Sequence, residues 1–552
     1  MLTILPARKR LFSLCVFPKK ETTQPATDHY PTHFSMKTPL LHSLRKAFQL
    51  SQRVQHHPDV PVEEWLASAP RHTLDRRHFL RTGAQAGLLL GIGGPALIQD
   101  LFWGKPKQKI AIVGAGMAGL SAGYHLRRKG VQATIFEGDK RVGGRIKSAR
   151  IFDNGRLNTE IGAEFIDTVH ADMLWFARVA GVDTRLMDVE KDLFGERDAF
   201  FFENQHRSLS DVLAELGPVY PQILADQEKL DGKGAALLDR LSLAEYIDKL
   251  PLSTWMKKLL DAAFVGENGL ETAEQSAANL LSILEIKNQK FYPFGASDER
   301  FKVIGGNDQI PKAIAKMLEG QIRLEHRLLA LRENADKSLT LTFSVNGKTV
   351  EEHFDLVVMT LPFSVLREVE MKMELPALKQ RVIRELGYGT NAKFILETRD
   401  RPWRNHGYRG FLFNEQISNG WDSAQMQNDN AGAGSFTCYF GGQRGQSAQR
   451  GSEQTQLEYV LPALEAAFPG SKTSLSGNME LAAWPSNPFV KGSYSCLKPG
   501  QTTDFEGAAF EPVRRLYFAG EHTSTEYWGF MNGAAETGRR VAETLLKKMR
   551  VR

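Results

Sequence analysis

The sequence predicts an α/β fold built on a parallel sheet, because a β-forming run passes directly into a glycine-rich turn and then a helix. Residues 109–113 (KIAIV) form the run, and Gly114, Gly116 and Gly119 follow it. A helical pattern over residues 121–129 comes next. Strand, glycine turn and helix in this order are typical of a dinucleotide-binding βαβ unit.

The three glycines have separate tasks in such a unit. The first permits a tight turn, the second lets the backbone approach a pyrophosphate, and the third lets the helix pack on the strand. The phosphates lie against unpaired N–H groups at the helix N-terminus. A second strand is expected over residues 132–136 and ends at Glu137, at the spacing of roughly 20 residues expected for a carboxylate that binds ribose hydroxyls. An acid there disfavours a 2′-phosphate, so NADP is not expected.

A second motif, RVGGR, follows at residues 141–145. Together with the glycine turn and Glu137, it resembles the flavin amine oxidase superfamily, in particular its monoamine and polyamine oxidases. The resemblance implies FAD as cofactor and a Rossmann-type FAD-binding domain (GR2-type) interleaved with an α+β substrate domain. We assign residues 107–170, 298–362 and 494–552 to the FAD-binding domain, and residues 171–297 and 363–493 to the substrate domain.

The composition excludes several other classes of protein. Of the 552 residues, 42% are hydrophobic and 24% are charged, which suffices for two domains with cores. The three cysteines, Cys15, Cys438 and Cys496, form no CxxC or Cys/His cluster, so neither a disulfide framework nor a metal site is expected. Residues 1–108 carry 15 Lys and Arg against 7 Asp and Glu. The remainder is near neutral, so nucleic acid is not an expected partner.

Residues 1–106 have no domain-like pattern and are expected to be a leader. Within them, Arg76 and Arg77 precede a short, weakly apolar run over residues 84–98. This pattern, around residues 75–98, resembles a twin-arginine export signal and implies a periplasmic or extracytoplasmic protein. The alternative is a basic linker with a chance arginine pair. The run is too short for a membrane span, so membrane association is expected only through the leader.

Residues 160–167 (EIGAEFID) contain the pair Gly162-Ala163. The resemblance places this segment beside the flavin ring and its ribityl chain. Amino-acid oxidases of the superfamily usually carry an arginine just after the pair, which clamps the substrate carboxylate, whereas Glu164 and Phe165 stand here. That difference argues against an amino-acid substrate. Asp167 falls where polyamine oxidases carry an acid or histidine that holds a remote ammonium group; a surface carboxylate at a turn is the alternative.

The segment from residue 171 to residue 297 is expected to be mostly helical. A hairpin is expected at Asn346-Gly347, with a strand before it and a buried strand after it. The turn Gly305-Gly306 resembles the family's second GG segment, and Leu328 matches the position whose backbone meets the adenine. The expected helices cover residues 173–179, 209–216, 227–241, 243–248 and 273–285, and the expected strands cover residues 322–331 and 356–360.

Lys393 stands in an otherwise apolar strand, in the stretch GTNAKF at residues 389–394. A charge inside an apolar strand costs free energy unless it is paired or functional. In the amine oxidases a lysine in this setting reaches flavin N5 through a water, and the resemblance gives Lys393 that role. Alternation along a strand leaves open an outward-facing lysine.

The last part of the chain returns to the flavin. Ser493 stands where monoamine oxidases carry the cysteine of a flavin thioether, so FAD is expected to be held without a covalent bond. Tyr494 matches one wall of the family's aromatic cage and Phe530 the other, although a buried phenylalanine is ordinarily core. The resemblance lets Glu521 bond the flavin's sugar-alcohol chain. It places the N–H of Met531 at the flavin pyrimidine, where a helix N-terminus favours negative charge.

The predicted site joins residues from both ends of the chain. The catalytic residues are Lys393, Tyr494 and Phe530; the cofactor-binding residues are Gly114, Gly116, Met117, Ala118, Gly119, Glu137, Arg145, Gly162, Ala163, Glu164, Leu328, Glu521 and Met531.

The resemblance implies FAD-dependent oxidation of a small amine to an imine, which water hydrolyses to an aldehyde and ammonia or an amine. Dioxygen is the expected acceptor and hydrogen peroxide the by-product. Three alternatives stay open from the sequence: an L-amino-acid oxidase, a carotenoid- or porphyrinogen-type flavin desaturase, and a non-catalytic FAD-binding protein.

Overall fold

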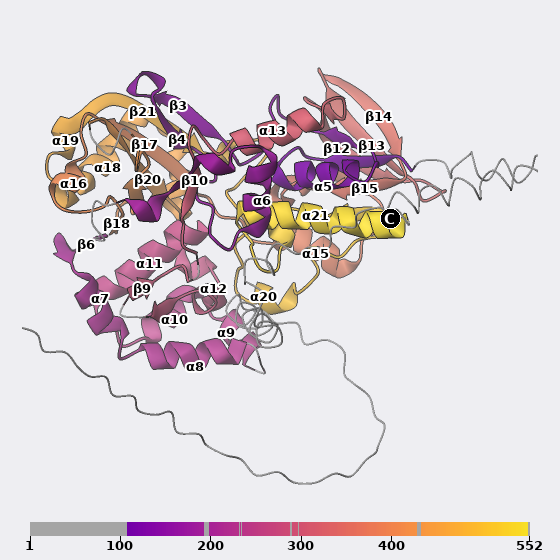
Figure 1. Cartoon of the computed structure of the whole chain (residues 1–552). Helices are drawn as coiled ribbons and strands as arrows, with labels where there is room; N and C mark the ends of the chain where they lie inside the picture. Colours follow the sequence, from indigo (N-terminus) through magenta and orange to yellow (C-terminus); the bar gives the residue numbers. More distant parts are fainter. Residues whose placement is uncertain are drawn as a thin grey trace, which may run out of the picture. The chain divides into compact units, whose positions relative to one another are not determined.

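The computed structural model describes residues 108–192, 198–230, 232, 234–287, 290–295, 297–427 and 432–549 (Figure 1). The predicted leader and its twin-arginine pattern lie outside these ranges. Within the described ranges, no helix combines the length and the apolar character needed to cross a membrane.

Strand β1, which precedes the glycine turn, lies in the middle of a five-stranded parallel sheet with strand order β11-β2-β1-β15-β22. All four residues of β1 are apolar and buried, as expected for a parallel sheet that is covered on both faces. Strands from distant segments of the chain therefore meet in one sheet, and the predicted α/β fold is confirmed. The strands are β1 (Ile110–Val113), β2 (Thr134–Phe136), β11 (Ile322–Arg323), β15 (Leu356–Met359) and β22 (Leu516–Phe518).

The two faces of β1 pack against different layers. Ile110 and Ile112 belong to a core shared with four helices, among which α5 and α21 lie side by side (Figure 1). Ala111 and Val113 belong to a second core shared with a four-stranded sheet. The helices are α5 (Met117–Arg127), α6 (Ala171–Val179), α13 (Gln309–Met317) and α21 (Met531–Lys548); the strands are β12 (Arg327–Glu333), β13 (Leu339–Val345), β14 (Lys348–Phe354) and β16 (Glu370–Lys372).

The first helix begins earlier than the sequence predicted. The expectation was residues 121–129, but α5 starts at Met117, inside the glycine motif. Gly114 adopts a φ of 108°, which turns the chain straight out of β1 into the helix. Gly119 sits where a Cβ atom would lie 1.9 Å from the carbonyl oxygen of Gly114. The third glycine is therefore required for close packing of α5 on β1.

The hairpin prediction is confirmed and one strand prediction is wrong. Asn346 and Gly347, with φ values of 50° and 75°, join β13 to β14. The expected single strand over residues 322–331 is instead β11 and β12, which belong to different sheets. Glu325, with a φ of 57°, bends the chain between them.

A seven-stranded sheet, with order β21-β17-β20-β19-β18-β6-β7, forms the second large sheet. Its β17 is buried at every residue, because alternate side chains enter two different cores. The strands fall within the two segments assigned to the substrate domain, although the domain boundaries stay a prediction. They are β6 (Ala199–Phe202), β7 (Gln205–Arg207), β17 (Ala392–Thr398), β18 (Leu412–Asn414), β19 (Ser418–Asp422), β20 (Gly434–Phe440) and β21 (Leu475–Ala483).

The expected helical segment contains more helices, and more breaks, than predicted. The helix over residues 209–216 is confirmed as α7 and begins with a capping box between Ser208 and Asp211. The predicted helix over residues 227–241 is wrong as one element, because the chain breaks between α8 and α9. The helix α11 was not predicted. The helices are α7 (Leu209–Leu216), α8 (Tyr220–Leu230), α9 (Ala235–Arg240), α10 (Leu243–Lys249), α11 (Thr254–Asn268) and α12 (Ala277–Leu281).

Short elements complete the described fold. The predicted helix over residues 273–285 was too long, since α12 is followed by the strand pair β8 and β9. The remaining strands are β3 (Ser148–Phe152), β4 (Leu157–Glu160), β5 (Leu186–Asp188), β8 (Glu285–Lys287), β9 (Lys290–Tyr292) and β10 (Phe301–Val303). The remaining helices are α14 (Phe363–Leu366), α15 (Ala377–Glu385), α16 (Pro402–Asn405), α17 (Gly442–Ala448), α18 (Glu453–Ala467), α19 (Ser471–Ser474) and α20 (Gln501–Asp504).

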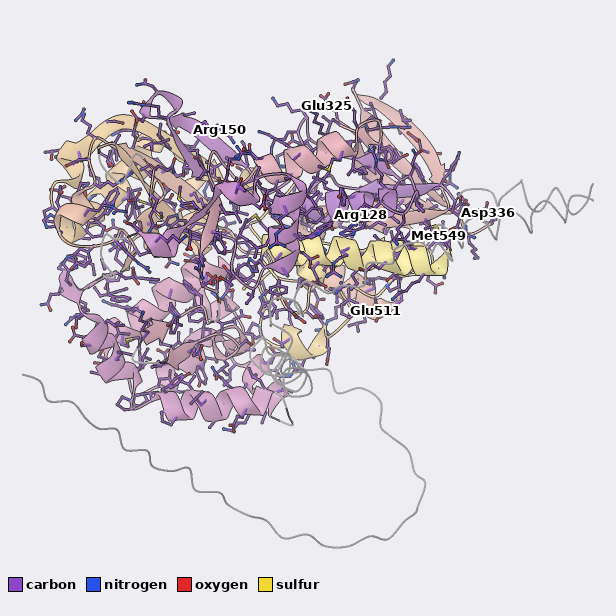
Figure 2. All side chains as sticks on the ribbon, in the orientation of Figure 1. Arg128, Arg150, Glu325, Asp336, Glu511 and Met549 are labelled. Atoms are coloured by element: carbon purple, nitrogen blue, oxygen red, sulfur yellow. The ribbon has the colours of Figure 1, made fainter. Side chains whose placement is uncertain are left out.

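The turn Gly305-Gly306 packs against β3. Arg150, labelled in Figure 2, donates to the carbonyl oxygen of Gly305 and pairs with Asp308 at 2.5 Å. Gly306 has a φ of 109°, and a Cβ atom there would meet the Ser148 hydroxyl at 2.6 Å. The close approach predicted for this turn is thus to a neighbouring strand.

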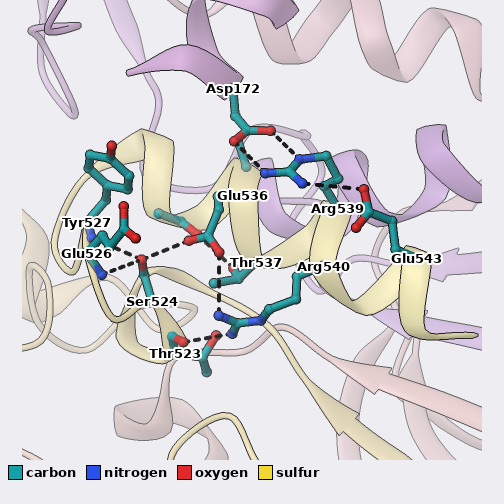
Figure 3. Close-up of polar contacts among 12 residues, drawn as sticks. Asp172, Thr523, Ser524, Glu526, Tyr527, Glu536, Thr537, Arg539, Arg540 and Glu543 are labelled. Atoms are coloured by element: carbon teal, nitrogen blue, oxygen red, sulfur yellow. Dashed lines mark hydrogen bonds and ion pairs between the residues drawn. The ribbon is translucent and has the colours of Figure 1, made fainter. Parts of the chain in front are cut away.

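Ion pairs hold the C-terminal helix α21 to its neighbours (Figure 3). Arg539 binds Asp172 of α6 through two hydrogen bonds of 2.6 and 3.0 Å, and it also pairs with Glu543. Glu536 accepts from Ser524 at 2.9 Å and pairs with Arg540. Arg539 thus ties α21 to α6, Glu536 ties it to the segment that precedes it, and the other two pairs lie within the helix.

We predict that Gly119→Ala destabilises the fold by about 1–3 kcal/mol, the usual cost of overpacking a core. The new methyl group would push α5 away from β1. Urea unfolding of the purified protein measures the change. Gly232→Ala is the control, because a Cβ atom there meets nothing within 4 Å. Equal unfolding midpoints for both variants would contradict the packing role of Gly119.

Candidate active site

A cavity of about 1540 Å³ is lined by residues of the parallel sheet, the seven-stranded sheet and helices α5 and α11. Gly119 alone among the predicted site residues does not line it, because that glycine packs on β1. The lining residues that were predicted are Gly114, Gly116, Met117, Ala118, Glu137, Arg145, Gly162, Ala163, Glu164, Leu328, Lys393, Tyr494, Glu521, Phe530 and Met531.

One end of the cavity suits a dinucleotide phosphate. The N-cap of α5 is Gly116, whose lack of a side chain leaves the first-turn N–H groups uncapped, and Met117 and Ala118 of that turn line the cavity. A helix N-terminus without a cap binds an anion readily. Glu137 at the end of β2 accepts from the N–H groups of Ala115 and Asp139, at 2.7 and 2.9 Å. Burial raises the pKa of this carboxyl group.

A buried ion pair stands further along the cavity. Arg145 Nη1 lies 2.8 Å from Glu521 and 2.6 Å from the carbonyl oxygen of Ser493. Glu521 also accepts from the Ser495 hydroxyl at 2.7 Å and from the N–H of Gly529 at 2.8 Å. Burial alone would raise the pKa of Glu521, but Arg145 and these donors outweigh it and hold the pKa below its usual range. Glu521 thus joins Arg145 to the turn that precedes α21.

The Lys393 side chain is buried, and its ammonium group has three hydrogen-bond acceptors. Its ammonium group donates to the carbonyl oxygens of Glu160 and Gly162, at 3.0 and 2.9 Å, and to Glu164 Oε2 at 2.7 Å. An ammonium group has three protons, so all are used here. The outward-facing alternative is excluded, because Lys393 is 4% exposed. The predicted bridge to flavin through a water stays a prediction, and it requires one of these three bonds to open.

A second lysine binds the same carboxylate. Lys302 Nζ of β10 lies 3.0 Å from Glu164 Oε1, and the side chains of Glu164 and Lys302 are 3% and 7% exposed. Burial would raise the pKa of Glu164, but the two ammonium groups hold it below its usual range. Sequence reasoning missed Lys302, although a lysine between two apolar residues of a short strand gives the same signal as Lys393.

The predicted cage residues both line the cavity. The Tyr494 hydroxyl donates to the carbonyl oxygen of Glu267 and lies 3.0 Å from the Tyr439 hydroxyl. The Phe530 ring lies 5.0 Å from the ring of His170. Tyr439 was not predicted; it pairs with Lys393 across β20 and β17, and the Lys393 ammonium lies 5.8 Å from its ring centre. The cage role of Tyr494 and Phe530 stays a prediction.

Three carboxyl groups lie in the cavity wall near these aromatic residues. Asp167 accepts from the N–H of Glu299 at 3.1 Å, and its own N–H donates to His170 Nδ1 at 2.9 Å. Burial raises the pKa of Asp167 to about 6, the pKa of Glu267 to about 7 and the pKa of Glu299 to about 8. Neighbouring carboxyl groups raise each of these pKa values further. Glu267 and Glu299 were missed because nothing local in the sequence marks them.

The two cysteines that the structure describes, Cys438 and Cys496, are buried outside the cavity lining. Cys496 is 1% exposed, burial raises the pKa of its thiol, and Cys438 is fully buried within the sheet. Neither lines the cavity, and Ser493 donates to Asn391 at 2.5 Å. No described cysteine is therefore placed to form a thioether, as expected for a cofactor held without a covalent bond.

The parallel sheet, the uncapped glycine turn and the long cavity define a dinucleotide-dependent oxidoreductase. The family model described as "Flavin containing amine oxidoreductase" matches residues 117–546. The chain therefore belongs to the flavin-containing amine oxidoreductase family. It is an oxidoreductase that acts on amines, and its cofactor is FAD.

The curated proteins that match this chain at low sequence identity are named for two different activities. The chain is 23% identical over 453 residues to an L-amino-acid oxidase of Pseudechis australis, an alignment that covers 78% of this chain and 85% of the relative. It is also 23% identical over 473 residues to flavin-containing amine oxidase A of Equus caballus, with 80% and 85% covered.

Solved structures share the fold. Cyclohexylamine oxidase from Brevibacterium oxydans IH-35A matches with a TM-score of 0.67 and 18% identity, over 81% of this chain and all of that chain. Putrescine oxidase bound to putrescine also matches with a TM-score of 0.67, at 16% identity, over 80% of this chain and 99% of that chain. These matches confirm the predicted architecture.

We predict that Arg145→Met lowers stability by about 3 kcal/mol at pH 7, because it leaves Glu521 buried without its cation. The folded-state pKa of Glu521 is depressed, so the pair's contribution is present above the ordinary pKa of glutamate and is lost as the pH falls through the folded-state value. The stability difference from wild type therefore shrinks in acid. Urea unfolding at a series of pH values measures it. Arg156→Met, which removes an exposed pair, is the control; a pH-independent difference would contradict the assignment.

Proposed function

We propose that the protein oxidises an amine that enters the cavity as a cation, with dioxygen as the electron acceptor and hydrogen peroxide as a product. The observation that carries the proposal is the group of carboxyl side chains Asp167, Glu267 and Glu299 in the cavity wall. Glu267 adjoins Tyr494 through the hydrogen bond from the tyrosine hydroxyl to its carbonyl oxygen. The predicted cage and the acidic wall are thus parts of one pocket.

The raised pKa values indicate what this wall binds. Burial destabilises the ionised form of each of the three carboxyl groups, and so does repulsion by neighbouring carboxylates: Asp298 acts on Asp167, Asp167 acts on Glu267, and Glu267 and Asp167 act on Glu299. A cation among them would lower the pKa of all three groups, so the cation and the ionised wall stabilise each other. Among the described side chains, neither Glu267 nor Glu299 has a hydrogen-bond partner. Both are therefore available to a bound ammonium group.

The acidic cavity wall also disfavours an amino acid as the substrate. The carboxylate of an amino acid would add a further negative charge beside Asp167, Glu267 and Glu299. The neighbouring cation, Arg409, is already bound to Asp198 at 2.6 Å. Glu164 and Phe165 stand where the superfamily's amino-acid oxidases usually carry an arginine, and Glu164 is bound to two lysines. These observations favour an amine over the activity named for the L-amino-acid oxidase relatives.

The residues present suit amine oxidation in two ways. Burial raises the pKa of Glu267 to about 7 when no cation is bound, so this group is a stronger base than an ordinary glutamate. Its carboxylate can take the proton of the bound ammonium group, which leaves the neutral amine beside Tyr494. Tyr494 and Phe530 orient the amine, and Lys393 with Gly162 and Ala163 forms the opposite wall. When bound, FAD supplies the acceptor for two electrons from the amine carbon. The resulting imine is hydrolysed by water to an aldehyde and ammonia or an amine.

We predict that anaerobic addition of butylamine or 1,4-diaminobutane bleaches the flavin absorbance, and that L-leucine and L-phenylalanine do not. The acidic wall attracts the first two compounds and repels the carboxylates of the last two. Absorbance near the flavin maximum measures bleaching, and peroxide release in air measures turnover. Faster bleaching by either amino acid than by both amines would overturn the amine proposal.

We predict that Lys393→Met slows flavin reduction by an amine at least about tenfold, because it removes the cation from the cavity wall and leaves Glu164 with one partner. Stopped-flow absorbance separates reduction by the amine from reoxidation by dioxygen. Lys498→Met, a change at a lysine whose side chain is 41% exposed, is the control. Unchanged rates of flavin reduction and reoxidation in Lys393→Met would contradict the role given to Lys393.

A further inference from the structure

Glu164 links two buried lysines that come from different parts of the fold. Its Oε2 lies 2.7 Å from Lys393 Nζ of β17, and its Oε1 lies 3.0 Å from Lys302 Nζ of β10. We infer that Glu164 is a positioning residue, which fixes the Lys393 ammonium group and sets the net charge of the cavity wall where FAD binds. The inference goes beyond the proposed function, because it holds for any amine substrate.

The geometry leaves Lys393 one arrangement. Two of its protons go to the carbonyl oxygens of Glu160 and Gly162, and the third goes to Glu164. The two carbonyl oxygens belong to the chain on either side of Ile161, in the segment that also carries Glu164. A single segment therefore supplies every acceptor of the Lys393 ammonium group. Removal of the carboxylate would free one proton and loosen the side chain.

Lys302 has a comparable environment. Its ammonium group also donates to the carbonyl oxygen of Ser423 at 3.4 Å and lies 5.0 Å from the ring centre of Phe165. A lysine with so little exposure is stable as a cation when a carboxylate compensates it. Glu164 provides that compensation for both lysines at once. The two lysines and Glu164 together carry a net charge of one positive unit, which the Glu160 carboxylate offsets when it is ionised.

This net charge matters to the cofactor, because reduction adds negative charge to the flavin. Positive charge beside the cavity favours the reduced form, and Glu164 and Lys393 of this cluster line the cavity. Removal of the Glu164 charge would raise the net positive charge and make FAD easier to reduce. Removal of the Lys302 charge would have the opposite effect. The carboxyl group of Glu160 is the nearest further acid in this segment, and its pKa is about 7.

The test is the reduction potential of bound FAD in Glu164→Gln, Lys302→Met and the double variant. Equilibration with a reference dye during anaerobic reduction at pH 8.5 keeps the Glu160 carboxyl ionised in each protein. For Glu164→Gln we expect the equilibrium constant for two-electron reduction to rise about tenfold, which corresponds to about 30 mV. For Lys302→Met we expect a fall of similar size. The double variant, whose net charge equals that of wild type, returns toward the wild-type value.

Glu397→Gln is the matched control. Glu397 lies in the same strand as Lys393 and is buried, but it accepts from Asp153 and Asn478 and does not line the cavity. The reduction potential of FAD bound to Glu397→Gln should match that of FAD bound to the wild-type protein. If Glu164→Gln fails to fold, Lys302→Met and the double variant still decide the matter. Equilibrium constants for FAD reduction within twofold of wild type in every variant that binds FAD would overturn the inference. A merely structural Glu164 would lower stability without this pattern of opposite shifts.

Discussion

The ion pair between Lys393 and Glu164 is the interaction on which the cavity depends. It joins the seven-stranded sheet, through β17, to the segment after β4, and Lys302 extends it to β10. Two charges so deeply buried are tolerated because each finds an opposite charge and further hydrogen bonds. Arg145 and Glu521 repeat the arrangement nearer the C-terminal helix. The cavity is thus bounded in part by paired charges, whereas the carboxyl groups of Glu267 and Glu299 have no hydrogen-bond partner among the described side chains.

The residues predicted from the sequence are those whose role follows from local backbone geometry. Gly114 and Gly119 can be read from the chain, because a turn with positive φ and a close helix–strand approach each require glycine. The Asn346-Gly347 hairpin is a similar case. Lys393 was predicted because a charged residue stands there in an otherwise apolar strand. The resemblance placed most of the other site residues. Of all the predicted site residues, Gly119 alone does not line the cavity.

Residues whose role comes from long-range contacts were not predictable. Glu267 ends a helix that the sequence reading did not identify, and Glu299 approaches Asp167 from more than a hundred residues away. Periodicity predicts a helix or strand but does not state where a chain leaves one sheet for another, which is why β11 and β12 were merged. It also fails for β17, where both faces are buried and the alternation that would reveal an outward side chain is absent.

The position of β22 has a consequence for biosynthesis. This strand lies at the edge of the parallel sheet beside β15, and α21, which follows it, packs on α5 near the glycine turn. A ribosome makes the chain from the N-terminus, so β1 and α5 emerge long before their C-terminal partners. Until then the edge of β15 is unpaired and Arg145 lacks Glu521. The cofactor pocket consequently closes only after β22 and α21 have been made and have emerged from the ribosome, so FAD must be captured after that point of synthesis.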